Sequence, residues 1–485
     1  MVHIGNTLVE RNPKMNSRLL TSIVLAASLL VFGCGDDGGG TGGGGATGGS
    51  GATGGAGGSG GIEPKDCDNL PPTSGYSIEG APATPTDDCT TTLNPSGGDD
   101  TAALAGALED ALTGDVICLG TGNFDVRGTL FVSNSALITL KGIDESPDGV
   151  VLDYAAALNG DGIEATTDGF TIENLWIKNT PLDSVVVRAD DATFRKVLVT
   201  WDAGSVLENG KYGIFPRAAN NVLIEYSEVI GASDAGIYVG QCIGAIVRNN
   251  KAIANVAGIE IENSQDIEVY DNEAYDNTAG LLAFQLPGLS LDGDNVLMRD
   301  NDMYCNNRLN FAAEGSIVSF VPAGTGVLIA AGQRFELRNN VIESNVSVGV
   351  LIASQVLLCQ LGEERPDCLT GWPDGFDPYP TQMFLNGNTF INNGQDPQET
   401  LGLIANLALM VDTLEDVQWD GYIDPAVTDP EICLGETDVP SFRDYSDNQC
   451  GAAAGLLGVG ECFGTNSNTS DEGHICTLPE LVIPL

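Results

Sequence analysis

The chain has 485 residues, and its 20 Lys and Arg against 67 Asp and Glu give a formal net charge of −47. This charge argues against binding of nucleic acid and disfavours adsorption to anionic lipid, because both require a basic surface. Only two histidines occur, His3 and His474, near opposite ends of the chain. A metal site or an acid–base mechanism built on imidazole is therefore excluded from the region between them.

The N-terminal residues 1–33 are typical of a signal peptide. Lys14 and Arg18 precede an apolar run from Leu19 to Phe32, which is too short for a comfortable membrane span. The run ends in Val-Phe-Gly-Cys34, which resembles a bacterial lipobox, so we expect Cys34 to be lipidated. In signals of this kind, a glycine after the cysteine favours the outer membrane. Translation could start at Met1 or at Met15.

Residues 34–62 are predicted to form a flexible tether. Within residues 38–61, 16 of the 24 positions are glycine, and such a segment cannot bury enough apolar surface to fold. Residues 63–97 follow as an irregular leader that contains Cys67 and Cys89. A lipid on Cys34 and a loose tether behind it would hold the remaining chain just off a bilayer.

A helix is expected from Thr101 to Leu112, since Leu104, Leu108 and Leu112 recur every four residues. Asp99 and Asp100 precede it, as the helix dipole prefers. Such a helix would close one end of a stack of repeats, where an exposed terminal coil would otherwise invite aggregation.

A repeat dominates residues 98–358. Gly236, Gly258 and Gly280 recur with a period of 22 residues, among short Val- and Ile-rich strands and Asn-, Asp- and Gly-rich turns. A fixed period of this size indicates a solenoid. We therefore predict an all-β fold, a right-handed single-stranded parallel β-helix of about ten coils. Insertions interrupt the period at Asp202–Tyr212, Gln285–Asn295 and Asn306–Thr325.

The Asn pairs 249/250 and 339/340, with Asp271-Asn272 between them, are predicted to form ladders of stacked amides at the turns. The three periodic glycines are expected at corners where a side chain would clash or where φ is positive.

The C-terminal residues 359–485 have no sustained period and are predicted to hold the last coils and an irregular, disulfide-rich region. The cysteines there are Cys359, Cys368, Cys433, Cys450, Cys462 and Cys476. Removing Cys34 from the 12 cysteines leaves an odd number, so at least one is unpaired in a monomer. Cys118, in an apolar strand, is predicted to be that buried free thiol.

Several stretches resemble a family of bacterial exported parallel β-helix repeat proteins that includes lipoproteins. The resemblance covers roughly residues 98–480, and its most similar stretches are Asn221–Tyr226, Gly231–Gln241, Asn255–Ser264, Leu286–Gly288, Val321–Gly326, Asp377–Pro380 and Trp419–Gly421. The family is similar in fold to pectate lyases, polygalacturonases and alginate epimerases. It implies a fold and an exported location, without an established reaction. The chain lacks the Gly-His-Gly and Arg-Ile-Lys signatures of polygalacturonases.

Carboxylates are the main candidates for chemistry. Asp234, Glu260 and Glu262 lie in or beside strands of consecutive coils, and Asp292 and Asp294 lie in a nearby insertion. Paired carboxylates can catalyse glycoside hydrolysis, and with Asn263 their hard oxygens would suit Ca²⁺, the one cofactor to be considered. The alternative is a solvated polar face without a function.

Tyrosines and cations form a second candidate set, a sugar groove in which rings stack on pyranose faces and cations hold uronate carboxylates. Its members are Lys211, Tyr212, Arg217, Tyr238, Gln241, Arg248 and Tyr270. The same residue types are also common as scattered surface residues of a β-helix.

Three functions remain open. The first is a lipid-anchored envelope protein that binds a polysaccharide or a partner protein along one flank. The second is a carbohydrate-active enzyme, either a Ca²⁺-assisted polysaccharide lyase or a glycosidase. The third is a structural spacer. The long insertions favour a shaped groove over a bare rod.

Overall fold

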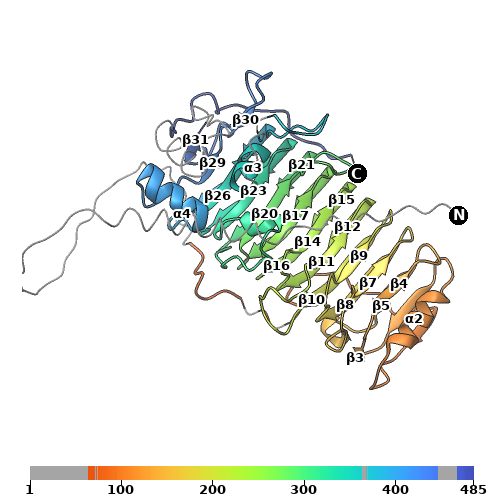
Figure 1. The fold of residues 1–485 in the computed structure, drawn as a ribbon. Coiled ribbons are helices and arrows are strands. Elements are labelled where there is room, and N and C mark those ends of the chain that lie inside the picture. The colour runs from red at the N-terminus through yellow and green to blue at the C-terminus, as the bar shows by residue number, and fades with distance from the viewer. Residues whose placement is uncertain are drawn as a thin grey trace, which may run out of the picture. The chain divides into compact units, whose positions relative to one another are not determined.

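The computed structural model describes residues 64–71, 73, 75–362, 368, 370–445 and 467–484. The predicted signal peptide, the lipidation site Cys34, the whole tether, and Cys450 and Cys462 lie outside these residues. The described chain is a right-handed parallel β-helix, as the repeat predicts (Figure 1). No helix among the described residues is long and apolar enough to cross a membrane.

One sheet, the B sheet, takes one strand from each of 11 coils, and all its pairings are parallel. Its strands are β4 (Leu130–Val132), β7 (Ile163–Ala165), β9 (Val185–Val187), β11 (Tyr212–Pro216), β14 (Ala235–Gly240), β17 (Ala257–Glu262), β20 (Ala279–Phe284), β23 (Thr325–Ala330), β26 (Val348–Ala353), β29 (Val417–Trp419) and β31 (Phe442–Asp444). The described coils therefore exceed the predicted ten, with about 13 turns in all.

The other sheet, the A sheet, has 20 strands in two columns. Two long strands, β8 (Thr171–Lys178) and β10 (Thr193–Thr200), belong to both columns. The first column adds β1 (Thr91–Leu93), β2 (Val116–Leu119), β5 (Thr139–Gly142), β12 (Asn220–Glu225), β15 (Ile243–Arg248), β18 (Gln265–Tyr270), β21 (Asp294–Arg299), β24 (Gln333–Arg338), β27 (Thr381–Asn386) and β30 (Ile432–Cys433). The second column adds β3 (Gly122–Asp125), β6 (Val150–Asp153), β13 (Glu228–Ile230), β16 (Lys251–Ile253), β19 (Glu273–Tyr275), β22 (Asp302–Tyr304), β25 (Val341–Glu343) and β28 (Thr389–Ile391).

The coil stack is longer than the repeat pattern indicates. It begins at β1, before residue 98, and β27 to β31 continue it well past residue 359. Insertions between these last strands hide the period in the sequence.

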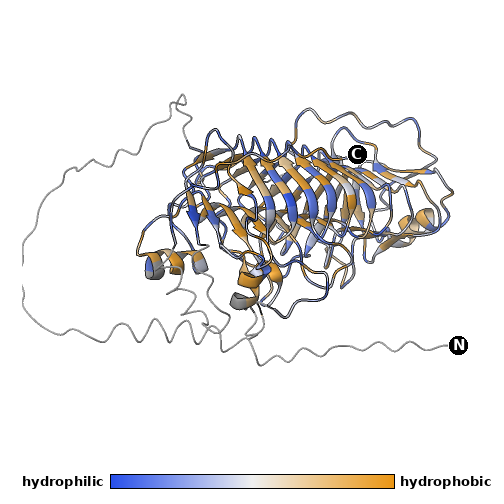
Figure 2. Cartoon of the chain, turned by 90° about the horizontal axis from the view of Figure 1, so that it is seen from above, coloured by the Kyte–Doolittle hydropathy of each residue, from blue (hydrophilic) through white to orange (hydrophobic). Residues whose placement is uncertain are grey.

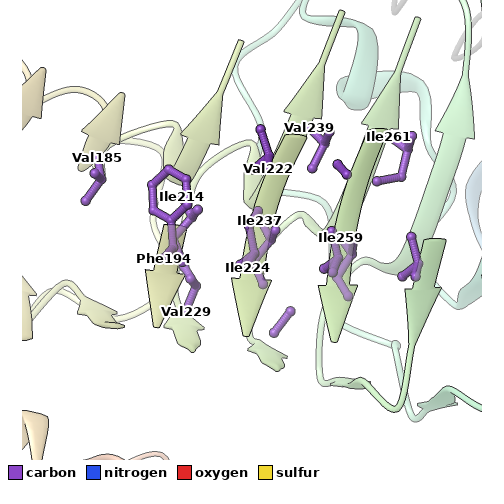
Figure 3. Close-up of a cluster of buried hydrophobic side chains, with 14 of the residues drawn as sticks. Val185, Phe194, Ile214, Val222, Ile224, Val229, Ile237, Val239, Ile259 and Ile261 are labelled. Atoms are coloured by element: carbon purple, nitrogen blue, oxygen red, sulfur yellow. The ribbon is translucent and has the colours of Figure 1, made fainter. Parts of the chain in front are cut away.

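The core consists of apolar side chains that point inward from all three columns of strands. Val185, Ile214, Ile237 and Ile259 stack on one another from coil to coil (Figure 3). In many strands, hydrophobic and hydrophilic residues alternate (Figure 2). The side chains between the core positions of the B sheet therefore point out of the stack, and the candidate site consists of these outward side chains.

Helices lie at one end and along the B sheet. Helix α2 (Thr101–Glu109) buries Leu104 and Leu108 against the first coils, as predicted for a cap. It ends three residues early, and Leu112 is 70% exposed, so the third leucine of the predicted stripe is not part of the helix. Helix α3 (Gln355–Gly362), helix α4 (Glu399–Leu403) with a π-helical turn (Ile404–Leu409), and the 3₁₀ turns Pro147–Gly149 and Ile317–Phe320 complete the helices.

The turn asparagines form two buried ladders. In the first, Asn250, Asn272, Asn301 and Asn340 each donate from Nδ2 to Oδ1 of the next asparagine over 2.9–3.0 Å, and the ladder ends at Asn388. The preceding residues Asn249, Asp271 and Asn339 have positive φ, so only the second member of each pair builds the ladder. A second ladder, absent from the sequence-based expectation, joins Asn255, Asn277, Asn306, Asn345 and Asn393.

The periodic glycines are required by close approach alone. A Cβ on Gly236 would lie 2.7 Å from the Asn255 amide nitrogen and 2.9 Å from the Gly258 carbonyl oxygen. Gly236, Gly258 and Gly280 are not among the glycines with positive φ. Of the two reasons given for these glycines, the steric clash is therefore confirmed.

Four disulfides join described residues: Cys67–Cys305, Cys89–Cys118, Cys359–Cys368 and Cys433–Cys476. The prediction that Cys118 is the free thiol is wrong, because this residue pairs with Cys89. The free thiol among the described residues is Cys242, which is buried. An apolar strand buries paired and unpaired sulfur equally well, so strand context could not distinguish the two.

The leader crosses the coils as a strap, which we define as residues 64–89. At one end, Cys67 is bonded to Cys305, just after β22, and at the other Cys89 is bonded to Cys118 in β2. Between them, Ser77 donates to the buried Glu228 carboxylate from both its backbone nitrogen and its hydroxyl. Thr84 donates to Glu173, and Asp88 pairs with the buried Lys141. The strap thus provides partners for charged side chains of the A sheet.

Candidate functional site

The outward side chains of β11, β14 and β17 bring together much of what the sequence proposed. Tyr238 is the register partner of Glu260 in the next coil, and Gly240 is the partner of Glu262. Because Ile237, Val239, Ile259 and Ile261 point into the core, Tyr238, Glu260 and Glu262 point outward. Their exposed fractions are nevertheless only 4%, 1% and 8%.

Three aromatic rings pack beside these carboxyl groups. The ring centroids of Tyr212, Phe215 and Tyr238 lie 4.6–4.8 Å apart, and Phe215 meets Tyr238 edge-on. The Tyr238 hydroxyl donates to Glu262 Oε1 over 2.8 Å. Burial, followed by the charges of the neighbouring carboxylates, raises the pKa of both tyrosines, so their hydroxyl groups stay protonated at neutral pH.

Two aspartates complete the group, and the sequence argument found only one of them. Asp234 immediately precedes β14, and its backbone nitrogen donates to the Lys211 carbonyl over 3.1 Å. Asp183 precedes β9, and its Oδ1 accepts from the Tyr212 backbone nitrogen over 3.3 Å. We call Asp183, Asp234, Glu260 and Glu262 the acid cluster. Asp234 Oδ1 and Glu260 Oε2 are buried with no hydrogen-bond partner among the described residues.

Burial is the main cause of the raised pKa values in this cluster. It raises the pKa of Asp183 to about 6, with a further contribution from Asp161, and the pKa of Asp234 to about 7. Burial and then the charge of Asp234 raise the pKa of Glu260 well above its ordinary value. Burial also raises the pKa of Glu262, against the opposing effects of the Tyr238 hydrogen bond and Arg217. Burial thus favours the protonated form in all four carboxyl groups, and Asp234 keeps part of its proton near neutral pH.

Two exposed cations lie beside the acid cluster, Lys211 at the start of β11 and Arg217 at its end. Lys211 is close enough to lower the pKa of Asp234 and Asp183, and Arg217 acts likewise on Glu262. Neither cation is within ion-pair distance of a described carboxylate. Among the described residues, the other lysines and arginines, the largely buried Lys196 excepted, are ion-paired: Lys65, Arg127, Lys141, Lys178, Arg188, Arg195, Arg248, Lys251, Arg299, Arg308, Arg334, Arg338 and Arg443.

The predicted sugar groove is split between the two sheets. Arg248 and Tyr270 lie on β15 and β18 of the A sheet, where Arg248 binds the Glu225 carboxylate and the Tyr270 hydroxyl. Arg299 covers the Tyr270 ring at 4.0 Å from its centroid. Lys211, Tyr212, Arg217 and Tyr238 stay together on the B sheet. Gln241 follows β14 directly, and its Oε1 accepts from the Ser290 hydroxyl.

Two of the five predicted carboxylates lie elsewhere. Asp294 begins β21 in the A sheet and forms an ion pair with Arg334. The Asp292 carbonyl accepts from the Gln265 side chain beside the same sheet. The structure thus groups Asp234, Glu260 and Glu262 without these two.

Asp183 could have been found from the register of the coils. It stands two residues before Val185, as Tyr212 stands two residues before Ile214, and Val185 pairs with Ile214. The insertion at Asp202–Tyr212 separates these strands by more than the usual period and hides this alignment. Among the described residues, no three His, Cys, Asp or Glu side chains are placed to hold a metal ion.

Comparison with known proteins supports the fold. The sequence matches the model of the right-handed beta helix region over residues 143–295 and 204–357. A comparison with curated protein sequences gave no match.

Solved β-helix structures superpose over much of the chain. One is the mannuronan C-5 epimerase AlgE4 A-module of Azotobacter vinelandii, with 16% identity and a TM-score of 0.47, covering 68% of this chain and 91% of that one. Another is a GH87 alpha-1,3-glucanase catalytic unit of Streptomyces thermodiastaticus, with 14% identity and a TM-score of 0.44, covering 71% of this chain and 52% of that one. A polygalacturonase of Erwinia carotovora has 14% identity and a TM-score of 0.35, covering 66% of this chain and 98% of that one. With identities of 16% or less and TM-scores below 0.5, these similarities carry no conclusion about this chain.

Proposed function

We propose that this right-handed β-helix protein binds an acidic polysaccharide along the outer face of β11, β14 and β17. The observation that carries the proposal is the pair Lys211 and Arg217. Both are exposed and unpaired with any described carboxylate, in a chain with a net charge of −47. In the part of the chain that the structure describes, ion pairing accounts for nearly all the other cations, so these two are available to a ligand.

The neighbouring groups suit a uronate sugar. Lysine and arginine bind carboxylates through charge-assisted hydrogen bonds, and the arginine fork can hold both oxygens. Tyr212 is half-buried, so its ring edge can contact a pyranose ring, and Gln241 offers a side-chain amide nearby. We expect the affinity to fall as salt is added, since exposed ionic contacts are screened.

The test compares a polyuronate with neutral dextran by isothermal titration calorimetry. Lys211→Ala combined with Arg217→Ala should weaken polyuronate binding about tenfold or more, equivalent to about 1.4 kcal/mol. The matched control is Arg127→Ala with Arg334→Ala, which removes the same charge from cations that are paired with aspartates. An equal loss of affinity in both double variants would contradict the proposal, because binding would then depend only on the net charge of the protein.

A second candidate, favoured by the raised pKa values of the acid cluster, is a carbohydrate-active enzyme. A carboxyl group that stays protonated near neutral pH is a suitable general acid. Polyuronates would be incubated with and without Ca²⁺, with assays for reducing ends and for unsaturated product. Product formation that is lost in Glu260→Gln and Glu262→Gln would establish the enzyme, and Ca²⁺ dependence would favour the lyase. If no product forms but the polyuronate still binds, the protein is a binding protein and not an enzyme for these substrates.

The location is proposed from two features. The four disulfides indicate an extracellular or periplasmic protein. The lipobox-like sequence at Cys34 supports a lipid anchor in the outer membrane of a bacterial envelope, with a polysaccharide or an envelope protein as the partner. Cys34→Ala should move the protein from the membrane fraction to the soluble fraction. A variant that stays in the membrane fraction would refute the anchor.

A further inference from the structure

An apolar cavity of about 70 Å³ adjoins the acid cluster on the same face of the B sheet. Its floor begins with Leu282 and Phe284 of β20, the register partners of Glu260 and Glu262. Leu328 and Leu351 continue the column of Leu282 through the next two coils. The outward side chains therefore change from charged to apolar between two adjacent strands, β17 and β20.

The cover of the cavity is also apolar. Ile317 and Val318 come from the 3₁₀ turn, and Leu357 comes from α3. Leu401 of α4 and Ile404 of the π-helical turn close the other side. These segments lie over the outer surface of the B sheet, so the cavity lies outside the core of the β-helix.

Two polar side chains at the cavity wall, Gln418 and Asp420, already have partners within the protein. Gln418 Oε1 accepts from the Tyr445 hydroxyl over 2.8 Å. Asp420 accepts from the backbone nitrogen and hydroxyl of Ser354 over 2.6 and 2.7 Å, and from the Tyr422 backbone nitrogen over 3.1 Å. A ligand that needs hydrogen bonds would find few here, whereas a hydrocarbon group requires none.

The edge of the cavity reaches solvent through hydrophobic residues. Phe320, which lines the cavity, is 39% exposed. Leu403, the neighbour of the lining residue Ile404, is 40% exposed. Exposed apolar side chains at the edge of an apolar cavity are typical of a binding site, because a hydrocarbon ligand would cover them.

We propose that the ligand is an acidic glycolipid, whose sugar carboxylate binds Arg217 and whose single hydrocarbon chain ends in this cavity. The inference rests on the proposed function and names its ligand class. Arg217, Gly240, Glu262 and Phe284 follow one another in register, one coil apart. Three coil steps separate the cation from the cavity floor by about 14 Å, a distance that a long alkyl chain can span.

The test measures binding of three probes below their micelle concentrations by isothermal titration calorimetry. They are dodecyl β-D-glucuronide, methyl β-D-glucuronide and dodecyl β-D-maltoside. The first should bind at least tenfold more tightly than either of the others, because only it has both the charge and the chain. If the dodecyl and methyl glucuronides bind equally well, the cavity takes no part and the inference is overturned.

Two sets of variants separate the inference from the proposed function. Ala330→Leu fills the cavity, and Phe320→Asp places a charge at its exposed edge, where folding is less at risk. Either change should bring the dodecyl glucuronide down to the affinity of the methyl glucuronide and leave the latter unchanged. If Lys211→Ala with Arg217→Ala leaves methyl glucuronide binding unaltered, the proposed function fails. If that pair abolishes binding while the cavity variants have no effect, the inference alone fails.

Discussion

Two buried glutamates on neighbouring coils, Glu225 of β12 and Glu260 of β17, have opposite surroundings. Glu225 lies in the A sheet between Arg195 and Arg248, with both carboxylate oxygens in ion pairs of 2.6 Å. Glu260 lies in the B sheet with one oxygen lacking any described partner and with a raised pKa. The same residue type is thus fully paired on one side of the molecule and only partly paired on the other. On a β-helix, the partner rather than the residue type distinguishes a structural charge from a candidate functional one.

The largest effect is expected where the strap holds the A-sheet side. Replacing both Cys67 and Cys305 with serine should lower the free energy of unfolding by up to about 5 kcal/mol, because their bond closes a very long loop. The measurement is urea denaturation followed by circular dichroism. Cys242→Ser serves as the control, as it removes a buried thiol without removing a cross-link. An unchanged urea midpoint in the double variant would mean that the strap adds no stability.

The B-sheet side should respond most to pH. The pKa of Asp234 is about 7 in the folded protein, against an ordinary value of 3.8. A raised acid pKa stabilises the fold below pH 4, and that contribution is lost as the pH rises through 7. The difference is on the order of 4 kcal/mol. Unfolding curves between pH 4 and pH 8 should show a smaller loss in Asp234→Asn than in the wild type, in which Asp234 adds to the other buried carboxyl groups. If the free energies of unfolding of the two proteins change with pH in the same way, Asp234 does not contribute to this pH dependence.

Glu225→Gln tests the paired glutamate. The change leaves Arg195 and Arg248 without their carboxylate and should cost about 3 kcal/mol, at the low end for a broken buried pair because both arginines are about a third exposed. Thermal or urea unfolding at pH 6 measures it. A cost below 1 kcal/mol would show that solvent replaces the lost partner.

Glu260→Gln is the matched substitution on the other sheet and should have the smallest effect. Burial raises the pKa of the Glu260 carboxyl and favours its protonated form, with which the amide is nearly isosteric. We expect a change in stability of less than about 1 kcal/mol. A loss as large as that of Glu225→Gln would indicate that Glu260 is ionised and paired, and would remove the contrast between the two sheets.

The sequence predicts the fold well because each coil makes the same contacts with the next coil. Gly236 and its periodic equivalents, and the ladder asparagines from Asn250 onward, are determined by contacts one coil away, which leave a fixed period in the sequence. The start and end of the stack were less predictable. The coils near Thr91 and after Cys359 have irregular connections, so their strands lose the period although they pair in the same way.

The candidate site was predicted in part. The spacing of Tyr238, Glu260 and Glu262 places them on one face, since their coils have equal length. Arg248 and Tyr270 are the same residue types as the cations and tyrosines of the site. Their sequence does not show that they lie on the A sheet, away from the site on the B sheet. The absence of partners around Lys211 and Arg217 depends on where every nearby carboxylate lies in space, and no local pattern records it. The cavity beside Leu282 depends likewise on residues from distant insertions.

The strap also determines where mechanical load would enter the fold. Pro64, the first described residue of this compact unit, lies three positions before Cys67, which is bonded to Cys305. Tension on the chain at Pro64 would pass directly to β22, bypassing the 238 positions that separate the two cysteines. The coils before β22 would not be peeled away one after another from the α2 end. When the protein is pulled from its N-terminal side, the Cys67–Cys305 bond would therefore keep these coils from unfolding one by one. The outer face of β11, β14 and β17 would keep its shape under shear.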